Sequence, residues 1–101
     1  MEITVSGRHI EVTATIREYA STKAAKLSRY FDRITAIEVV ADKHDSLNYE
    51  VEIIVKAEHT DPFVAKSART DLYACIDDVT HKLERQLTDH KERLRNRKHN
   101  I

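Results

Sequence analysis

Six histidines, one cysteine and a series of regularly spaced basic residues are the side chains of this 101-residue chain that could do chemistry. The histidines are scattered, and no HxxxH or HExxH pair places two of them on one helical face. Cys75 has no CxxC partner, so we expect it to pack as a small hydrophobic residue rather than to bind zinc. With one glycine there is no Gly-rich phosphate loop, and no Ser-His-Asp set stands out. The residues therefore predict no metal, no cofactor and no small-molecule substrate, and a binding protein rather than an enzyme.

The basic residues recur at helical spacing in two segments. Residues 13–34 carry five basic side chains against two acidic ones, and residues 79–101 carry seven against three. Lys82 and Arg85 stand three residues apart and outside the apolar stripe, so both can point outward together. The net charge of zero hides this division, because residues 35–70 carry seven acidic side chains against four basic ones. The pattern fits either a site for a polyanion, such as structured RNA held by its phosphates, or ordinary solvated helix faces.

The longest predicted element is a helix from Asp71 to Lys98. Its apolar residues recur at steps of three and four, with His90 filling a gap in the stripe: Leu72, Ile76, Val79, Leu83, Leu87 and Leu94. Such a helix is about 40 Å long, whereas a strand of six to eight residues spans about 20–27 Å. We therefore expect the helix to extend past the sheet on which it packs, and the last residues, 96–101, to fray in the free protein.

The rest of the chain predicts one further helix and four strands. The helix is expected over residues 16–34, with Thr13 or Thr15 as its N-cap. Alternating or β-branched runs place the strands at residues 2–6, 37–41, 49–55 and 63–69. Thr70 is the expected cap of the last helix.

This order, β-α-β-β-β-α, predicts a single α+β domain over residues 1–101, with a four-stranded sheet and two helices packed on one face. The opposite face would meet water and carry acidic side chains: Glu2, Glu38, Glu50 and Glu52. No apolar run approaches membrane-spanning length, and the N-terminus shows no secretory leader. We therefore expect a cytoplasmic protein that binds no membrane.

Three helical segments resemble a known family. Residues 23–34 (KAAKLSRYFDRI) resemble the end of the first helix of the short ribosome hibernation promoting factors, in the ribosome-associated translation inhibitor family. Residues 71–77 (DLYACID) and 82–88 (KLERQLT) resemble the D-x-Y-x-x-I-D and K-L-x-R-Q-L segments of that family's second helix. The similarity covers essentially the whole chain, and the family's fold has the element order predicted above.

The resemblance implies binding to the small ribosomal subunit and its rRNA, in the channel where messenger and transfer RNA lie. Translation is blocked there, and idle ribosomes are preserved in stationary phase. The basic family positions matched here are Lys26, Lys82 and Arg85, and Arg29 occupies a position that is basic in some members. The full RNA-binding set predicted from the two helices lies at six positions: Lys23, Lys26, Arg29, Lys82, Arg85 and Lys91.

Two departures from the family pattern bear on mechanism. Asp89 stands where the family commonly has a lysine, and Lys91, two residues on, can compensate for it. We expect neither the extra C-terminal domain of the long members nor the acidic tail of the related translation inhibitor. The implied role is then to promote ribosome dimers together with ribosome modulation factor.

A second hypothesis stays open. The chain could be a protein-interaction module that acts without RNA and uses the acidic face of its sheet. Binding to small subunits at two salt concentrations distinguishes the two, since phosphate contacts are sensitive to salt.

Overall fold

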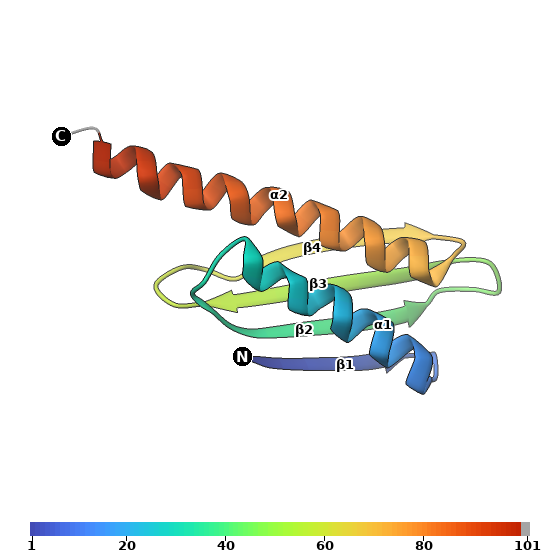
Figure 1. Ribbon diagram of the computed structural model, residues 1–101. Coiled ribbons are helices and arrows are strands. Elements are labelled where there is room, and N and C mark those ends of the chain that lie inside the picture. The colour runs from blue at the N-terminus through green and yellow to red at the C-terminus, as the bar shows by residue number, and fades with distance from the viewer. Residues whose placement is uncertain (100–101) are drawn as a thin grey trace.

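The computed structural model describes the backbone of residues 1–99 and the side chains of residues 1–96. The elements follow the chain as β1 (Glu2–Arg8), α1 (Ala14–Ala25), a 3-10 helix η1 (Lys26–Arg29), β2 (Ile34–Lys43), β3 (Tyr49–Ala57), β4 (Phe63–Arg69) and α2 (Leu72–His99). Figure 1 shows α1 and α2 lying on the same face of the sheet. The predicted α+β fold and its β-α-β-β-β-α order are confirmed.

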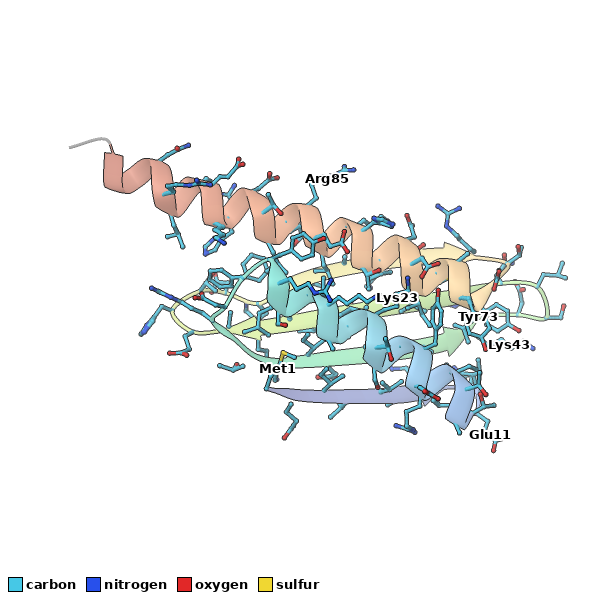
Figure 2. The ribbon with its side chains drawn as sticks, in the orientation of Figure 1. Met1, Glu11, Lys23, Lys43, Tyr73 and Arg85 are labelled. Carbon is cyan, nitrogen blue, oxygen red and sulfur yellow. The ribbon has the colours of Figure 1, made fainter. Side chains whose placement is uncertain are left out.

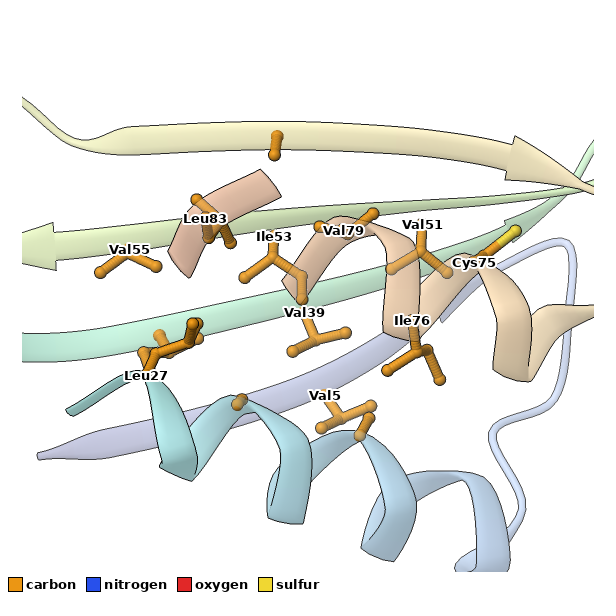
Figure 3. Packing of buried hydrophobic residues seen from close by; sticks show 14 of the residues in the cluster. Val5, Leu27, Val39, Val51, Ile53, Val55, Cys75, Ile76, Val79 and Leu83 are labelled. Atoms are coloured by element: carbon orange, nitrogen blue, oxygen red, sulfur yellow. The ribbon is translucent and has the colours of Figure 1, made fainter. Parts of the chain in front are cut away.

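The sheet has the strand order β1-β2-β3-β4. Strand β1 runs parallel to β2, with α1 as the crossover, and the other two pairs are antiparallel. The register aligns Val5, Val39, Ile53 and Ala65 across all four strands, and all four side chains are buried. Figure 3 shows Val5, Val39 and Ile53 of this row packed with side chains of η1 and α2, among them Leu27, Ile76 and Leu83. One apolar core between sheet and helices thus holds the fold together.

Gly7 allows the chain to turn back over the end of β1. A side-chain carbon at this position would lie 2.5 Å from the carbonyl oxygen of Ile10. The turn continues through His9, which adopts φ = 57°, and leads into α1. Thr13 caps that helix, since its hydroxyl accepts the backbone N–H of Ile16 at 3.2 Å. Of the two predicted caps, Thr13 is therefore right and Thr15 is not used.

The predicted end of the first helix is wrong. Helix α1 ends at Ala25 and tightens into η1, and Ile34 is already the first residue of β2. Leu27, Phe31 and Ile34 are all buried as the helical spacing requires, but they come from a 3-10 turn, a loop and a strand. The Ser28 hydroxyl also donates to the Ala25 carbonyl at 2.9 Å, a local bond that competes with regular helix.

The strand bounds are closest to prediction in β4, which matches residues 63–69, whereas β1, β2 and β3 are all longer than expected. The long helix agrees within one residue at each end, but its cap is Asp71 rather than Thr70. The Asp71 carboxylate accepts the N–H of Tyr73 at 3.0 Å. The helix extends beyond the strands at its C-terminal end, as Figure 1 shows, which confirms the predicted overhang.

Of the segment expected to fray, residues 96–99 are helical and residues 100–101 lie outside the described part of the chain. Within residues 1–99, neither helix combines the length and the apolar character that crossing a membrane requires.

Candidate nucleic-acid interface

Lys23 lies at the junction of the two helices. The Tyr19 hydroxyl donates to Asp77 at 2.6 Å, and the Tyr19 and Tyr73 rings meet edge to face at 4.9 Å. Lys23 Nζ is 3.5 Å from the Asp77 carboxylate and 5.5 Å from the centre of the Tyr19 ring. The hydrogen bond to Asp77, together with burial, raises the pKa of Tyr19 to about 12. The charge of Lys23 is therefore already matched inside the protein, although its side chain remains partly exposed.

Lys82 lies at the exposed edge of the sheet. Strand β4 is an edge strand, and its outer carbonyl groups have no neighbouring strand to bind them. Lys82 Nζ donates to the carbonyl oxygen of Lys66 at 2.7 Å, and Gln86 Nε2 donates to that of Val64 at 3.1 Å. Two helical side chains thus satisfy the edge, and Lys82 is exposed at its side chain but has its ammonium group bound to β4 and beside Asp78.

Asp78 ties the start of α2 to the same edge. Its carboxylate accepts the Ser67 hydroxyl at 2.6 Å and lies 3.5 Å from Arg69 and 3.6 Å from Lys82. The Ser67 hydrogen bond, supported by the two cations, holds the pKa of Asp78 below its ordinary value. The acidic residues near the start of α2 are therefore used within the fold.

The other four residues of the predicted set are exposed, as Lys82 also is: Lys26, Arg29, Arg85 and Lys91. None of them lies within 4.0 Å of an acidic side chain among residues 1–96. We call these four side chains the basic helical surface. The charges of this surface are available to a ligand, in contrast to those of Lys23 and Lys82.

Arg85 stands beside a shallow hollow between η1 and α2. The hollow is lined by Tyr30, His81, Glu84, Arg85, Thr88 and Asp89. In Figure 2 the Arg85 side chain points away from α1 and from the strands. Lys91 borders the next hollow along α2, beside Phe31 and Arg33. The surface therefore has its side chains on η1 and α2, with the Tyr30 ring beside Arg85.

This arrangement suits binding of phosphates rather than bond-making chemistry. Guanidinium and ammonium groups donate charge-assisted hydrogen bonds to phosphate oxygens. No group of three or more metal-ligating side chains occurs among the described residues. Cys75 is buried, and burial raises the pKa of its thiol, which disfavours the reactive thiolate.

The six predicted RNA-binding residues do not include Tyr30 or Arg33. Arg33 follows Arg29 by four residues, and this repeat was a usable signal. The place of Tyr30 beside Arg85 had no such signal, because it depends on how η1 packs against α2.

The chain matches the family model described as Sigma 54 modulation protein / S30EA ribosomal protein over residues 3–95. A ribosome hibernation promoting factor of Pseudomonas putida is 38% identical over 92% of this chain and 89% of its own length. The factor of Escherichia coli is 35% identical, over 94% of this chain and 98% of its own length. The N-terminal domain of Protein Y from Thermus thermophilus superposes with a TM-score of 0.80 at 32% identity, covering 89% of this chain and 99% of that domain. A ribosomal subunit interface protein from Coxiella burnetii gives a TM-score of 0.82 at 26% identity, covering 91% of this chain and 99% of its own. The chain therefore belongs to the Sigma 54 modulation protein / S30EA ribosomal protein family, together with these ribosome hibernation promoting factors.

Proposed function

We propose that this protein binds the small ribosomal subunit by laying its basic helical surface on rRNA, and that it thereby blocks translation in idle ribosomes. It acts in the cytoplasm as a binding protein rather than as an enzyme. Family membership supports the ribosome as the partner, because the similar proteins of Pseudomonas putida and Escherichia coli are named ribosome hibernation promoting factors.

The observation that carries the proposal is the separation of paired from unpaired charge. Lys23 and Lys82 are matched by Asp77 and Asp78, whereas the four side chains of the basic helical surface have no acidic partner among residues 1–96. Each unpaired cation that meets a phosphate releases a counterion and adds affinity without reading a base. Structured rRNA is the kind of ligand that such contacts recognise by shape.

The proposed mechanism requires only that the bound protein fill the channel. A protein bound in the channel for messenger and transfer RNA excludes both, so no chemical step is needed to stop translation. The buried core under the two helices keeps the basic side chains in place, which limits the entropy lost on binding.

We also propose that the bound protein promotes ribosome dimers together with ribosome modulation factor. The names of the similar proteins support a role in ribosome hibernation. The formation of ribosome dimers is inferred from the family resemblance. Ribosome profiles on sucrose gradients, with each protein alone and with both, test this step: dimers that need both proteins are the expected result.

The decisive binding experiment is co-sedimentation with purified small subunits at two salt concentrations. The variant Lys26→Glu/Arg85→Glu should lose binding and keep its fold, because both side chains are exposed and unpaired. Arg8→Glu, at the opposite end of the sheet, is the matched control and should bind like the wild type. Lys82→Glu is a poor probe, because it would place a carboxylate beside Asp78 and the Lys66 carbonyl.

The alternative, a protein-interaction module using the acidic sheet face, predicts the opposite result. Wild-type binding by the double variant, with little dependence on salt, would contradict the proposed RNA surface and favour that module.

A further inference from the structure

A third hollow lies between three segments: the loop before β2, the turn between β3 and β4, and the C-terminal part of α2. Figure 1 shows the loop and the turn at the same end of the sheet. Its wall includes Phe31, Arg33, His59, His90, Arg93 and Leu94. None of the six basic residues predicted from the helices lines this hollow. The hollow adjoins the basic helical surface without including its side chains, because it shares Phe31, Arg33 and Leu94 with the hollow that Lys91 borders.

The walls of the hollow are held by contacts between the three segments. The backbone N–H of Glu58 donates to the Arg33 carbonyl at 3.0 Å, which joins the β3–β4 turn to the loop before β2. The His90 ring packs edge to face against Phe31 at 5.3 Å and against Phe63 at 5.2 Å. The backbone of His59 adopts φ = 62°, a left-handed conformation that shapes the turn. The hollow is thus formed before any ligand arrives.

Most side chains of the hollow that can donate hydrogen bonds are basic. The guanidinium groups of Arg33 and Arg93 are exposed and pair with no acidic side chain among residues 1–96. His59 and His90 add imidazole N–H donors, and Phe31 and Leu94 add an apolar wall. Glu58 is the one acidic residue on the wall, and its carboxylate repels an anion.

We infer that this hollow binds the phosphate group of a ribose phosphate, with the sugar against Phe31 and Leu94. Arg33 and Arg93 line the same hollow from different segments, so their guanidinium groups can both donate to the oxygens of a phosphate, and the apolar wall matches the carbon face of the sugar. The group comes either from an RNA backbone or from a free nucleotide. The inference goes beyond the proposed function, because it concerns the isolated protein and side chains outside the basic helical surface.

The first experiment titrates the isolated protein with inorganic phosphate at constant ionic strength while the imidazole signals of His59 and His90 are followed by NMR. Both signals should shift together with one dissociation constant. Arg33→Gln and Arg93→Gln should each weaken binding about tenfold, the usual size of one charge-assisted hydrogen bond. Glu58→Gln should tighten it, and Arg8→Gln, at the other end of the sheet, should leave it unchanged.

The second experiment separates the two sources of phosphate by comparing uridine monophosphate with a short single-stranded RNA. Tighter binding of the RNA, lost in Arg33→Gln, assigns the hollow to an RNA backbone, whereas equal affinities assign it to a free nucleotide. Unshifted His59 and His90 signals with all three ligands would overturn the inference. So would binding that is indifferent to Arg33, Arg93 and Glu58. Ribosomes are absent from these measurements, so failure here is separate from failure of the proposed function.

Discussion

The two halves of α2 differ in what their side chains contact. Before residue 88, the stripe from Leu72 to Leu87 is buried, and Asp77 and Asp78 are bound to side chains of α1 and β4. Beyond residue 88, Leu94 is only partly buried, and Arg93 and Arg95 are exposed without acidic partners among residues 1–96. The first half therefore mainly stabilises the fold, although Arg85 is exposed there without an acidic partner among residues 1–96, and the second half presents charge.

This division explains how one helix can contribute to both stability and binding. Charges that bind phosphate must be free of internal partners, and charges that hold the fold must have them. Substitutions of buried or paired side chains in the first half should therefore act mainly on the free energy of unfolding. Substitutions of Arg85 and of the exposed basic side chains in the second half should act on affinity for RNA.

The largest expected effect is the loss of a core side chain. Leu83 is fully buried between the helix and the sheet (Figure 3), so Leu83→Ala should lower the free energy of unfolding by about 2–5 kcal/mol. Leu94→Ala removes the same atoms from a partly solvated site and should cost less than about 1.5 kcal/mol. Urea denaturation of both variants measures the difference. Equal losses would show that the overhanging half is as firmly packed as the first half.

A smaller effect is expected at Asp78, and it should depend on pH. Asp78→Asn weakens the contacts to Ser67, Arg69 and Lys82 and should lower the free energy of unfolding by about 1 kcal/mol at neutral pH. Because folding lowers the pKa of Asp78, its stabilising effect is present above the pKa of the unfolded chain. The effect is lost as the pH falls through the lower pKa of the folded state.

Urea denaturation of wild type and Asp78→Asn between neutral and acidic pH tests this dependence. The difference between them should vanish at the acidic end. Glu92→Gln, in the second half of α2, is the matched control and should leave stability almost unchanged at every pH. A difference at Asp78 that persists at low pH would show that the carboxylate charge is not responsible.

Much of the fold could be predicted because local patterns determined it. Helix α2 has a clear period, and β4 follows a turn signal at Pro62, and the bounds of both agreed within one residue. The end of α1 failed because Leu27, Phe31 and Ile34 keep helical spacing while the chain turns toward the sheet. A period records which residues are buried, not which backbone conformation buries them.

The site was harder to predict because it depends on contacts between distant segments. Spacing alone placed Lys82 and Arg85 together, but Lys82 binds the β4 edge, sixteen positions back along the chain at Lys66. The hollow near Arg33 and Arg93 had no local signal, since its wall comes from a loop, a turn and a helix. Charge counts indicated the basic helices but could not separate paired from unpaired side chains.

Substitution of Asp89 should have the smallest effect on folding. It also tests most directly whether the second half of α2 contacts RNA. Asp89 is exposed and lines the same hollow as Arg85 and Tyr30. It lies within 4.0 Å of no basic side chain among residues 1–96, so a supporting ion pair with Arg85 or Arg93 is not formed. An exposed pair of that kind would add only about 0.3–0.5 kcal/mol. Its substitution should therefore leave the free energy of unfolding almost unchanged.

The effect on binding should be larger. If Arg85 meets phosphate, a carboxylate at Asp89 repels the same phosphate backbone, and a lysine there would displace one more counterion. Asp89→Lys should then tighten binding to small subunits at moderate salt and steepen the log–log salt dependence by roughly one unit. Asp89→Ala should tighten binding without steepening the slope, because it removes the repulsion and adds no cation. Glu11→Lys makes the same charge change at the far end of the molecule (Figure 2) and should alter neither quantity. An equal gain in Glu11→Lys would mean that net charge alone drives association, and unchanged binding in both Asp89 variants would place this part of α2 away from the RNA.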